Sequence, residues 1–156
     1  MTTRINAASY IKTGLGQAML ALQQQVETSG LEHSLIELVK LRTSQINGCA
    51  YCLDMHSKDA RALGETEQRI YALNAWRETP FFSDRERAAL EWAAAVTRVS
   101  VDHVPDSVYD AVAPHFAEAE LVALTFAVVA INSWNRLAIS FRAPVGSYQS
   151  PHAKVA

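Results

Sequence analysis

Four polar residues at fixed spacing give this sequence its capacity for chemistry: Glu37, Cys49, Cys52 and His56. A Cys-X-X-Cys pair brings two sulfurs within reach of each other and is typical of redox-active or metal-binding sites in proteins that carry no disulfide framework. His56 follows Cys52 by four residues, one turn of a helix, so its imidazole can take a thiol proton directly or through one water. These residue types indicate a nucleophilic thiol beside a base.

Asn47 and Gly48 directly precede the cysteine pair, and both residue types tolerate the positive φ at which helices end. We expect the next helix to begin with Cys49 at or beside its N-cap and Cys52 in its first turn. Unpaired N–H groups and the positive end of the helix dipole favour a thiolate there. The helix terminus thus favours Cys49 as the more acidic and more exposed thiol, whereas the proximity of His56 favours Cys52.

The position of Glu37 relative to His56 follows from helix geometry. Glu37 precedes Ile46 by nine residues, roughly 13 Å at 1.5 Å per residue, and His56 follows Cys49 by seven residues, roughly 10 Å. If the two helices are antiparallel, Glu37 and His56 lie at nearly the same height. A carboxylate in that place orients the imidazole and stabilises its protonated form.

Glu37 also has a local interpretation, since Ser34-x-x-Glu37 fits a capping box. Ser29-x-x-Glu32 fits one equally well and agrees better with the helical apolar pattern that begins at Leu31. We therefore favour a buried Glu37 that serves His56.

The sulfurs have two alternatives to redox chemistry. Cysteine is often a small buried hydrophobe. Zinc would accept Cys49, Cys52, His56 and Glu37 as ligands, but no second Cys-X-X-Cys or paired histidine completes the usual closed set. We predict no metal and, because no flavin, haem or nicotinamide motif is present, no cofactor.

The composition predicts an all-α fold. Alanine occurs 25 times, glycine six times and proline five times, and no segment alternates with period two. We expect a compact bundle of about six to seven helices, with the cysteine pair at a helix N-terminus in an antiparallel helical hairpin. One domain is expected over residues 1–156, with a core at about 15–142 and a mobile or partner-grasping tail at 143–156. The expected helices cover 5–26, 31–47, 50–63 and 66–76, one opening at Ser83, one opening near Pro105, and 118–141.

The charge balance and apolar runs exclude several classes of partner. The net charge is −2 and the isoelectric point about 6.2, so no nucleic-acid partner is indicated. The longest apolar stretch, Leu121–Ile131, has 11 residues, whereas a membrane-spanning helix needs about 20. The N-terminus has no apolar signal core, so we expect a cytoplasmic protein without a membrane partner.

The 121–131 stretch is apolar on all sides, which predicts that it is either central or covered by another subunit. A bundle of this size encloses few positions fully, so we favour a homo-oligomer. Tryptophan and arginine are enriched at protein interfaces. We accordingly expect Arg42, Asn132, Trp134 and Arg136 at a subunit contact rather than in a pocket.

The spacing Glu37-x11-Cys49-x2-Cys52-x3-His56 resembles that of the alkylhydroperoxidase D-like group of the carboxymuconolactone decarboxylase-like superfamily. The segment from Asn132 to Arg136 also resembles a recurrent feature of its small members. The resemblance covers about residues 15–142. It implies an all-α fold, trimers or hexamers, and reduction of organic hydroperoxides by a cysteine pair.

By that resemblance Cys52 matches the peroxidatic cysteine and Cys49 the resolving one, while His56 matches the general base and Glu37 the group that orients it. Tyr51 stands where some relatives carry a histidine. The implied reductant is an external dithiol, either a lipoyl-bearing or a thioredoxin-like protein. Two alternative functions remain. One is a disulfide-exchange adaptor that passes electrons to another peroxidase. The other is a lactone decarboxylase, which is less favoured because related decarboxylases do not rely on a cysteine pair.

Overall fold

The structure is a computed structural model that describes residues 2–152, and all its regular elements over this range are helical. This confirms the all-α prediction. Short helices make the described elements more numerous than the six or seven expected. The elements are α1 (Ala7–Ile11), α2 (Gly14–Glu27), α3 (His33–Asn47), α4 (Ala50–Ala62), α5 (Glu67–Ala72), the 3₁₀ helix η1 (Leu73–Glu78), α6 (Asp84–Thr97), α7 (Val99–Asp102), α8 (Asp106–Val112), the 3₁₀ helix η2 (Ala113–His115) and α9 (Glu118–Phe141).

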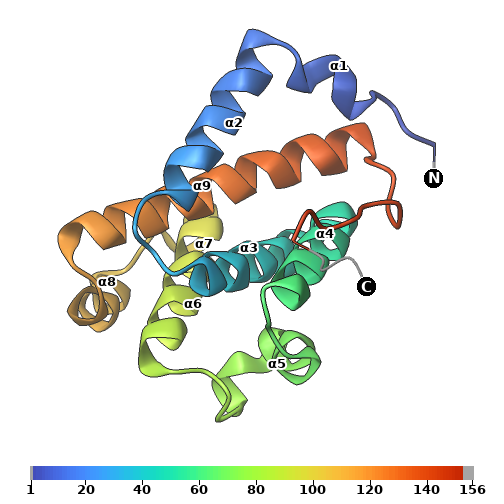
Figure 1. The fold of residues 1–156 in the computed structure, drawn as a ribbon. Helices are drawn as coiled ribbons and strands as arrows, with labels where there is room; N and C mark the ends of the chain where they lie inside the picture. Colours follow the sequence, from blue (N-terminus) through green and yellow to red (C-terminus); the bar gives the residue numbers. More distant parts are fainter. Residues whose placement is uncertain (1, 153–156) are drawn as a thin grey trace.

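Helices α3 and α9 form the centre of the bundle. α9 crosses the molecule, with α1 and α2 on one side of it and α3, α4 and α6 on the other (Figure 1). α3 packs against α4, α6 and α9, and its residues from Leu35 to Ser44 are all buried. Two apolar clusters flank it, one with Val39 and Val128, the other with Leu38 and Leu90. α3 is therefore held on several sides, and so are the polar residues it carries.

The N-terminal region differs from the single helix expected over 5–26. Thr13 caps a new helix, its side chain accepting a hydrogen bond from the N–H of Gly16 at 3.1 Å. Gly16 also permits a close approach of the chain, since a Cβ there would lie 2.2 Å from the carbonyl oxygen of Tyr10. The expected helix is thus broken into α1 and α2, and α1 turns back toward α9 (Figure 1).

The local capping signals were partly right. The helix expected to open at Ser83 does so, and Ser83 and Glu86 form a capping box at the start of α6. Neither box proposed near α3 forms, because the N-cap of α3 is Glu32 and its side chain makes no capping hydrogen bond. Ser29 instead donates to the carbonyl oxygen of Val26.

Helix α9 is buried on one side only. Leu124 and Val128 are fully enclosed, whereas Val122, Phe126 and Val129 are 42–51% exposed along the opposite side. By length and composition α9 would be long enough to cross a membrane, but it packs against α2, α3, α4 and α6, as the core helix of a bundle does. The protomer thus leaves an apolar row on α9 uncovered, which is the arrangement that favoured a second subunit.

Candidate active site

The cysteine pair lies at the bend between α3 and α4. Gly48 adopts a left-handed conformation, with φ 69°, and ends α3. Cys49 is the N-cap of α4, and its Sγ accepts a hydrogen bond from the N–H of Cys52 at 3.3 Å. The two Cα atoms are 5.4 Å apart and the sulfurs form a disulfide. The structure therefore shows the oxidised state of the pair, in which neither sulfur is available as a thiolate ligand for zinc.

The two sulfur-bearing side chains face different surroundings. Both cysteines pack in a cluster with Tyr51, Ala138 and Ala143, but Cys52 lines the cavity and Cys49 does not. Cys49 is 1% exposed and Cys52 is 2% exposed. The expectation that Cys49 is the more exposed thiol was wrong, because the end of α9 covers this helix terminus. The two cysteines differ in their access to the cavity, which Cys52 contacts and Cys49 does not.

Glu37 and His56 meet across the antiparallel pair of helices. Glu37 Oε2 lies 2.9 Å from Nδ1 of His56, and Glu37 Oε1 accepts from Nζ of Lys40 at 2.8 Å. His56 and Glu37 are 4% and 7% exposed. Because Glu37 holds Nδ1, Nε2 is the ring nitrogen left to exchange a proton. Lys40 was not among the predicted site residues, although its position one turn after Glu37 places it on the same face of α3.

The charge on Glu37 is strongly favoured. Burial raises the pKa of the Glu37 carboxyl, but the hydrogen bond and charge of His56, together with Lys40, outweigh it and lower the pKa from 4.5 to about 2. Glu37 is therefore an anion at every pH at which the protein would work. The carboxylate also fixes the orientation of the imidazole through its contact with Nδ1.

A network of amide side chains fixes the bend that carries the cysteines. Asn47 donates from Nδ2 to Oδ1 of Asn135 at 2.8 Å and to Oδ1 of Asn132 at 3.0 Å. Asn135 is fully buried and donates to Oγ of Ser44 at 3.1 Å. The last turn of α3 is thereby tied to α9. In the sequence, all three asparagines stand next to apolar helical stretches, which could have marked them as buried. Nothing in the sequence shows which of them pair with one another.

The residues expected at a subunit contact lie in different places. Trp134 lines the cavity, so it takes the pocket position that the expectation disfavoured. Arg42 is buried within the protomer and donates to Asn74 at 2.6 Å. Arg136 is exposed and donates to Asn132. Asn132 thus serves the hairpin, and only Arg136 has the exposure that the expectation required.

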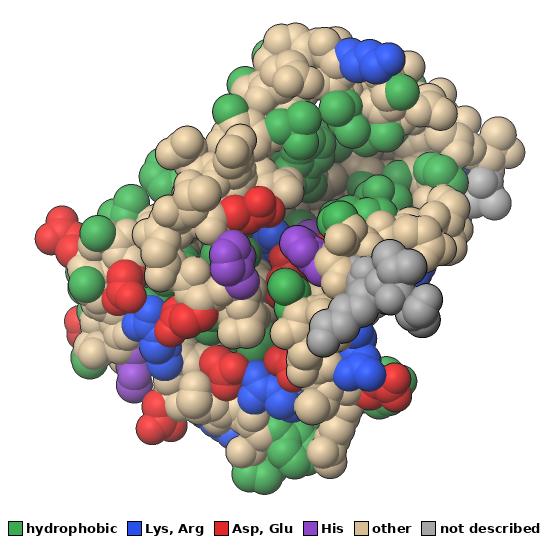
Figure 2. Space-filling view, viewed as in Figure 1, with side chains coloured by type: hydrophobic (Ala, Val, Ile, Leu, Met, Phe, Trp, Pro, Cys, Tyr) green, Lys and Arg blue, Asp and Glu red, His purple; other side chains and the backbone are tan. Residues whose placement is uncertain are grey.

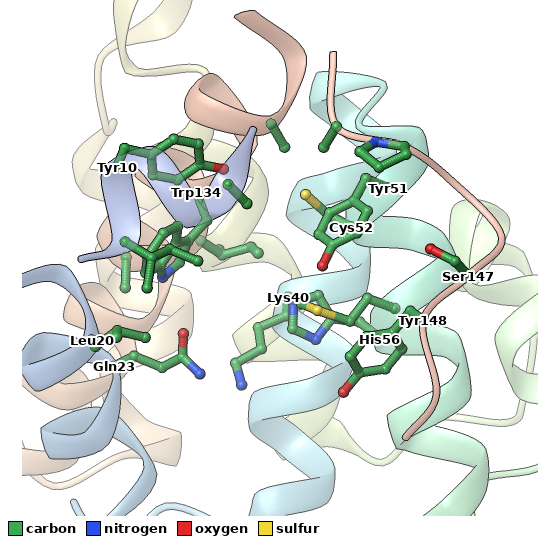
Figure 3. A pocket seen from close by; sticks show the side chains of 18 of the residues that line it. Tyr10, Leu20, Gln23, Lys40, Tyr51, Cys52, His56, Trp134, Ser147 and Tyr148 are labelled. Carbon is green, nitrogen blue, oxygen red and sulfur yellow. The ribbon is translucent and has the colours of Figure 1, made fainter. Parts of the chain in front are cut away.

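The cavity in front of Cys52 has a volume of about 550 Å³. It opens between α1 and α2 on one side and the C-terminal segment on the other, and hydrophobic side chains line it (Figure 2). Its two walls come from segments far apart in the sequence (Figure 3). The labelled lining residues are Tyr10, Leu20, Gln23 and Trp134 on one side, Tyr51, Cys52, His56, Ser147 and Tyr148 on the other, and Lys40 between them.

The C-terminal segment belongs to the cavity wall and is not a free tail over its described part. Its backbone is anchored on α4: the N–H of Gly146 donates to Asp54 at 3.1 Å, and Lys58 donates to the carbonyl oxygen of Tyr148 at 3.0 Å. Lys58 also pairs with Asp54 at 2.9 Å. Residues 143–150 of the expected tail therefore pack against the protein. Residues 153–156 of that tail lie outside the described residues.

Comparisons with known proteins agree with the fold and show the family. The model of the carboxymuconolactone decarboxylase family matches residues 14–95. The uncharacterized protein YdfG of Bacillus subtilis is 41% identical over 140 residues, which are 90% of this chain and 95% of YdfG. A crystal structure from Agrobacterium tumefaciens, of a protein of unknown function described as a putative antioxidant defence protein AhpD, is 42% identical. Its TM-score is 0.88, and the match covers 94% of this chain and all of the other.

A more distant structure shows how far the fold extends. The debrominase Bmp8 in its apo form has a TM-score of 0.77 at 20% identity, over 85% of this chain and 72% of its own. The resemblance inferred from the spacing of Glu37, Cys49, Cys52 and His56 is confirmed at the level of the family. The chain belongs to the carboxymuconolactone decarboxylase family, as an alkylhydroperoxidase D-like member.

Proposed function

We propose that this protein is a thiol peroxidase that reduces organic hydroperoxides through a dithiol–disulfide cycle of Cys49 and Cys52. The observation that carries the proposal is that Cys52 and His56 line one apolar cavity, while Glu37 holds His56 from behind at 2.9 Å. A peroxidase-like antioxidant role at the level of the family supports it.

The cycle begins with the reduced pair. His56 takes the proton of the Cys52 thiol at Nε2, and the thiolate attacks the terminal oxygen of the hydroperoxide. A sulfur–oxygen bond forms, the oxygen–oxygen bond breaks, and the leaving alkoxide receives the proton from His56 as an alcohol. Cys52 is then a sulfenic acid. The Cys49 sulfur attacks it, a disulfide forms and water leaves.

An external dithiol closes the cycle. It supplies two electrons and two protons by disulfide exchange and is itself oxidised to a disulfide. A lipoyl-bearing or thioredoxin-like protein has this chemistry, and a cytoplasmic location would keep it reduced. In this scheme Cys49 is the sulfur that the donor attacks, since release of the Cys52 thiolate beside His56 regenerates the peroxidatic group.

The cavity predicts a preference for apolar peroxides. Hydrophobic side chains such as Leu20, Ile131 and Trp134 contribute most of its wall. Burial of a methylene is worth about 0.8 kcal/mol, so the apolar part of a substrate supplies binding energy that hydrogen peroxide lacks. We expect kcat/KM for cumene hydroperoxide to exceed that for hydrogen peroxide at least about tenfold.

Peroxide consumption by the pre-reduced protein, measured for both substrates in the absence of any other peroxidase, tests the proposal. A rate below that of free dithiol at the same concentration would contradict it. That result would leave the adaptor function, in which the same dithiol passes electrons onward. The oxidised protein serves as the control, because its thiols are already consumed.

The uncovered apolar row on α9 leads us to propose a homo-oligomer, with trimers or hexamers as the expected forms. Val122, Phe126 and Val129 lie on one side of the helix at a spacing of three to four residues. Replacement of Phe126 by Glu should reduce the molar mass measured by light scattering toward that of one 17.2 kDa chain. A wild-type protein that already has the mass of one chain would contradict the proposal.

A further inference from the structure

Asp59 lies next to the proposed Glu37–His56 pair, although no motif in the sequence singled it out. One of its carboxylate oxygens lies within 4.8 Å of both a Glu37 oxygen and a ring nitrogen of His56. Cys52, His56 and Asp59 follow one another at intervals of four and three residues, so they share a face of α4. Asp59 is 8% exposed. A second buried anion therefore lies beside the imidazole.

The partner of Asp59 comes from the C-terminal segment. The hydroxyl of Tyr148 lies 2.9 Å and 3.0 Å from the two carboxylate oxygens of Asp59 and donates its single hydrogen to them. Burial, followed by the hydrogen bond to Asp59, raises the pKa of Tyr148 well above its usual range, so the phenol remains a donor. Tyr148 also lines the cavity. One side chain thus connects the cavity wall to the acidic group.

We infer that Asp59 and Tyr148 are positioning residues for the proposed peroxidase: Asp59 favours the protonated form of His56, and Tyr148, delivered by the docked segment, holds the Asp59 carboxylate in place. This inference rests on the proposed function, because it explains how readily His56 takes the proton of the Cys52 thiol. Two carboxylates this close repel each other unless a cation lies between them. Protonation of the imidazole relieves that repulsion.

Other charged and titratable groups around this centre come from every element packed on it. α3 contributes Glu37 and Lys40, and Glu27 of α2 lies 3.4 Å from Lys40. α4 adds Tyr51 and Lys58, and α1 contributes Tyr10 to the cavity. Lys40 already pairs with Glu37 and Glu27, so the positive charge that forms on His56 when it takes the Cys52 proton is the one beside Asp59. Asp59 is two turns from Cys52 but adjacent to His56 in space, so it stabilises the imidazolium more than it repels the thiolate.

The test measures thiolate formation and needs no peroxide. In a Cys49→Ser background, where serine keeps a good N-cap, Cys52 is the sole thiol. We expect the pH midpoint of its alkylation by iodoacetamide to rise by about one unit in Asp59→Asn and by roughly half a unit in Tyr148→Phe. Asp59→Glu, which retains the charge, should recover most of the shift.

Tyr71→Phe is the matched control, because it removes another tyrosine–carboxylate hydrogen bond, to Glu67 at 3.2 Å on an exposed helix. It should leave the midpoint unchanged. Unchanged midpoints in Asp59→Asn and Tyr148→Phe, or rates altered by one factor at every pH, would overturn the inference, since a purely structural or access role changes rate without moving the midpoint. Failure of the proposed function would appear separately, as absent peroxide consumption with these shifts intact.

Discussion

Replacement of Cys52 by serine will lower kcat/KM for cumene hydroperoxide by at least about 10³-fold, because a serine hydroxyl beside His56 is not an adequate nucleophile toward a peroxide oxygen. The cavity and the relay remain in this variant, since the two side chains differ by one atom. Measured folding stability should stay close to that of the reduced wild type. The loss would therefore report on the nucleophile alone.

Cys49→Ser is the matched control for that variant. Cys49 lies outside the cavity lining and packs against Ala138, so we expect its loss to permit one turnover and then stop at a sulfenic acid on Cys52. Trapping with dimedone followed by mass spectrometry should find one adduct, on Cys52. An adduct in Cys52→Ser protein, with none in Cys49→Ser protein, would reverse the assignment of the two cysteines.

The second large effect concerns stability in acid. The pKa of Glu37 falls from 4.5 to about 2 on folding, so the unfolded chain binds this proton more readily than the folded protein. The stabilisation is fully present above about pH 5 and is lost as the pH falls through 4.5 toward 2. One unit of pKa shift corresponds to about 1.36 kcal/mol, so the charge of Glu37 stabilises the folded protein by about 3 kcal/mol. Glu37 is 7% exposed, so solvent screens the charge of its carboxylate only weakly.

Urea unfolding of wild type and Glu37→Gln as a function of pH measures this contribution. We expect the variant to be less stable by about 3 kcal/mol at pH 7 and by under about 1 kcal/mol at pH 2. Glu27→Gln is the control, because Glu27 contacts the same Lys40 at 3.4 Å but its side chain is 38% exposed, and it should cost less than about 1 kcal/mol. A pH-independent difference for Glu37→Gln would show that the loss comes from packing rather than charge.

The sequence predicted the hairpin well because its determinants are local. Gly48 tolerates a positive φ, helical rise sets the heights of Glu37 and His56, and an interval of four residues places His56 on the face of Cys52. None of these features depends on a distant segment. The expected extent of the helix at 118–141 also agrees with α9, since its long apolar run has no internal breaker.

The features that were missed depend on contacts between segments far apart in the chain. Asp59 is an ordinary helical aspartate until Tyr148, 89 residues later, reaches its carboxylate. Asn135 lies 88 residues from Asn47, and neither has a local pattern that specifies the pairing. The break between α1 and α2 likewise requires the close packing at Gly16, which periodicity alone does not reveal.

The positions of the three tryptophans should make the intrinsic fluorescence of this protein sensitive to the redox state of its cysteine pair. Trp76 and Trp92 sit in the two apolar clusters, whereas Trp134 lines the chamber that holds Cys52. A disulfide quenches indole emission at short range, so opening the Cys49–Cys52 bond should brighten one fluorophore and leave the other two as an internal reference. Turnover could then be followed in a stopped-flow instrument without any dye or coupling enzyme.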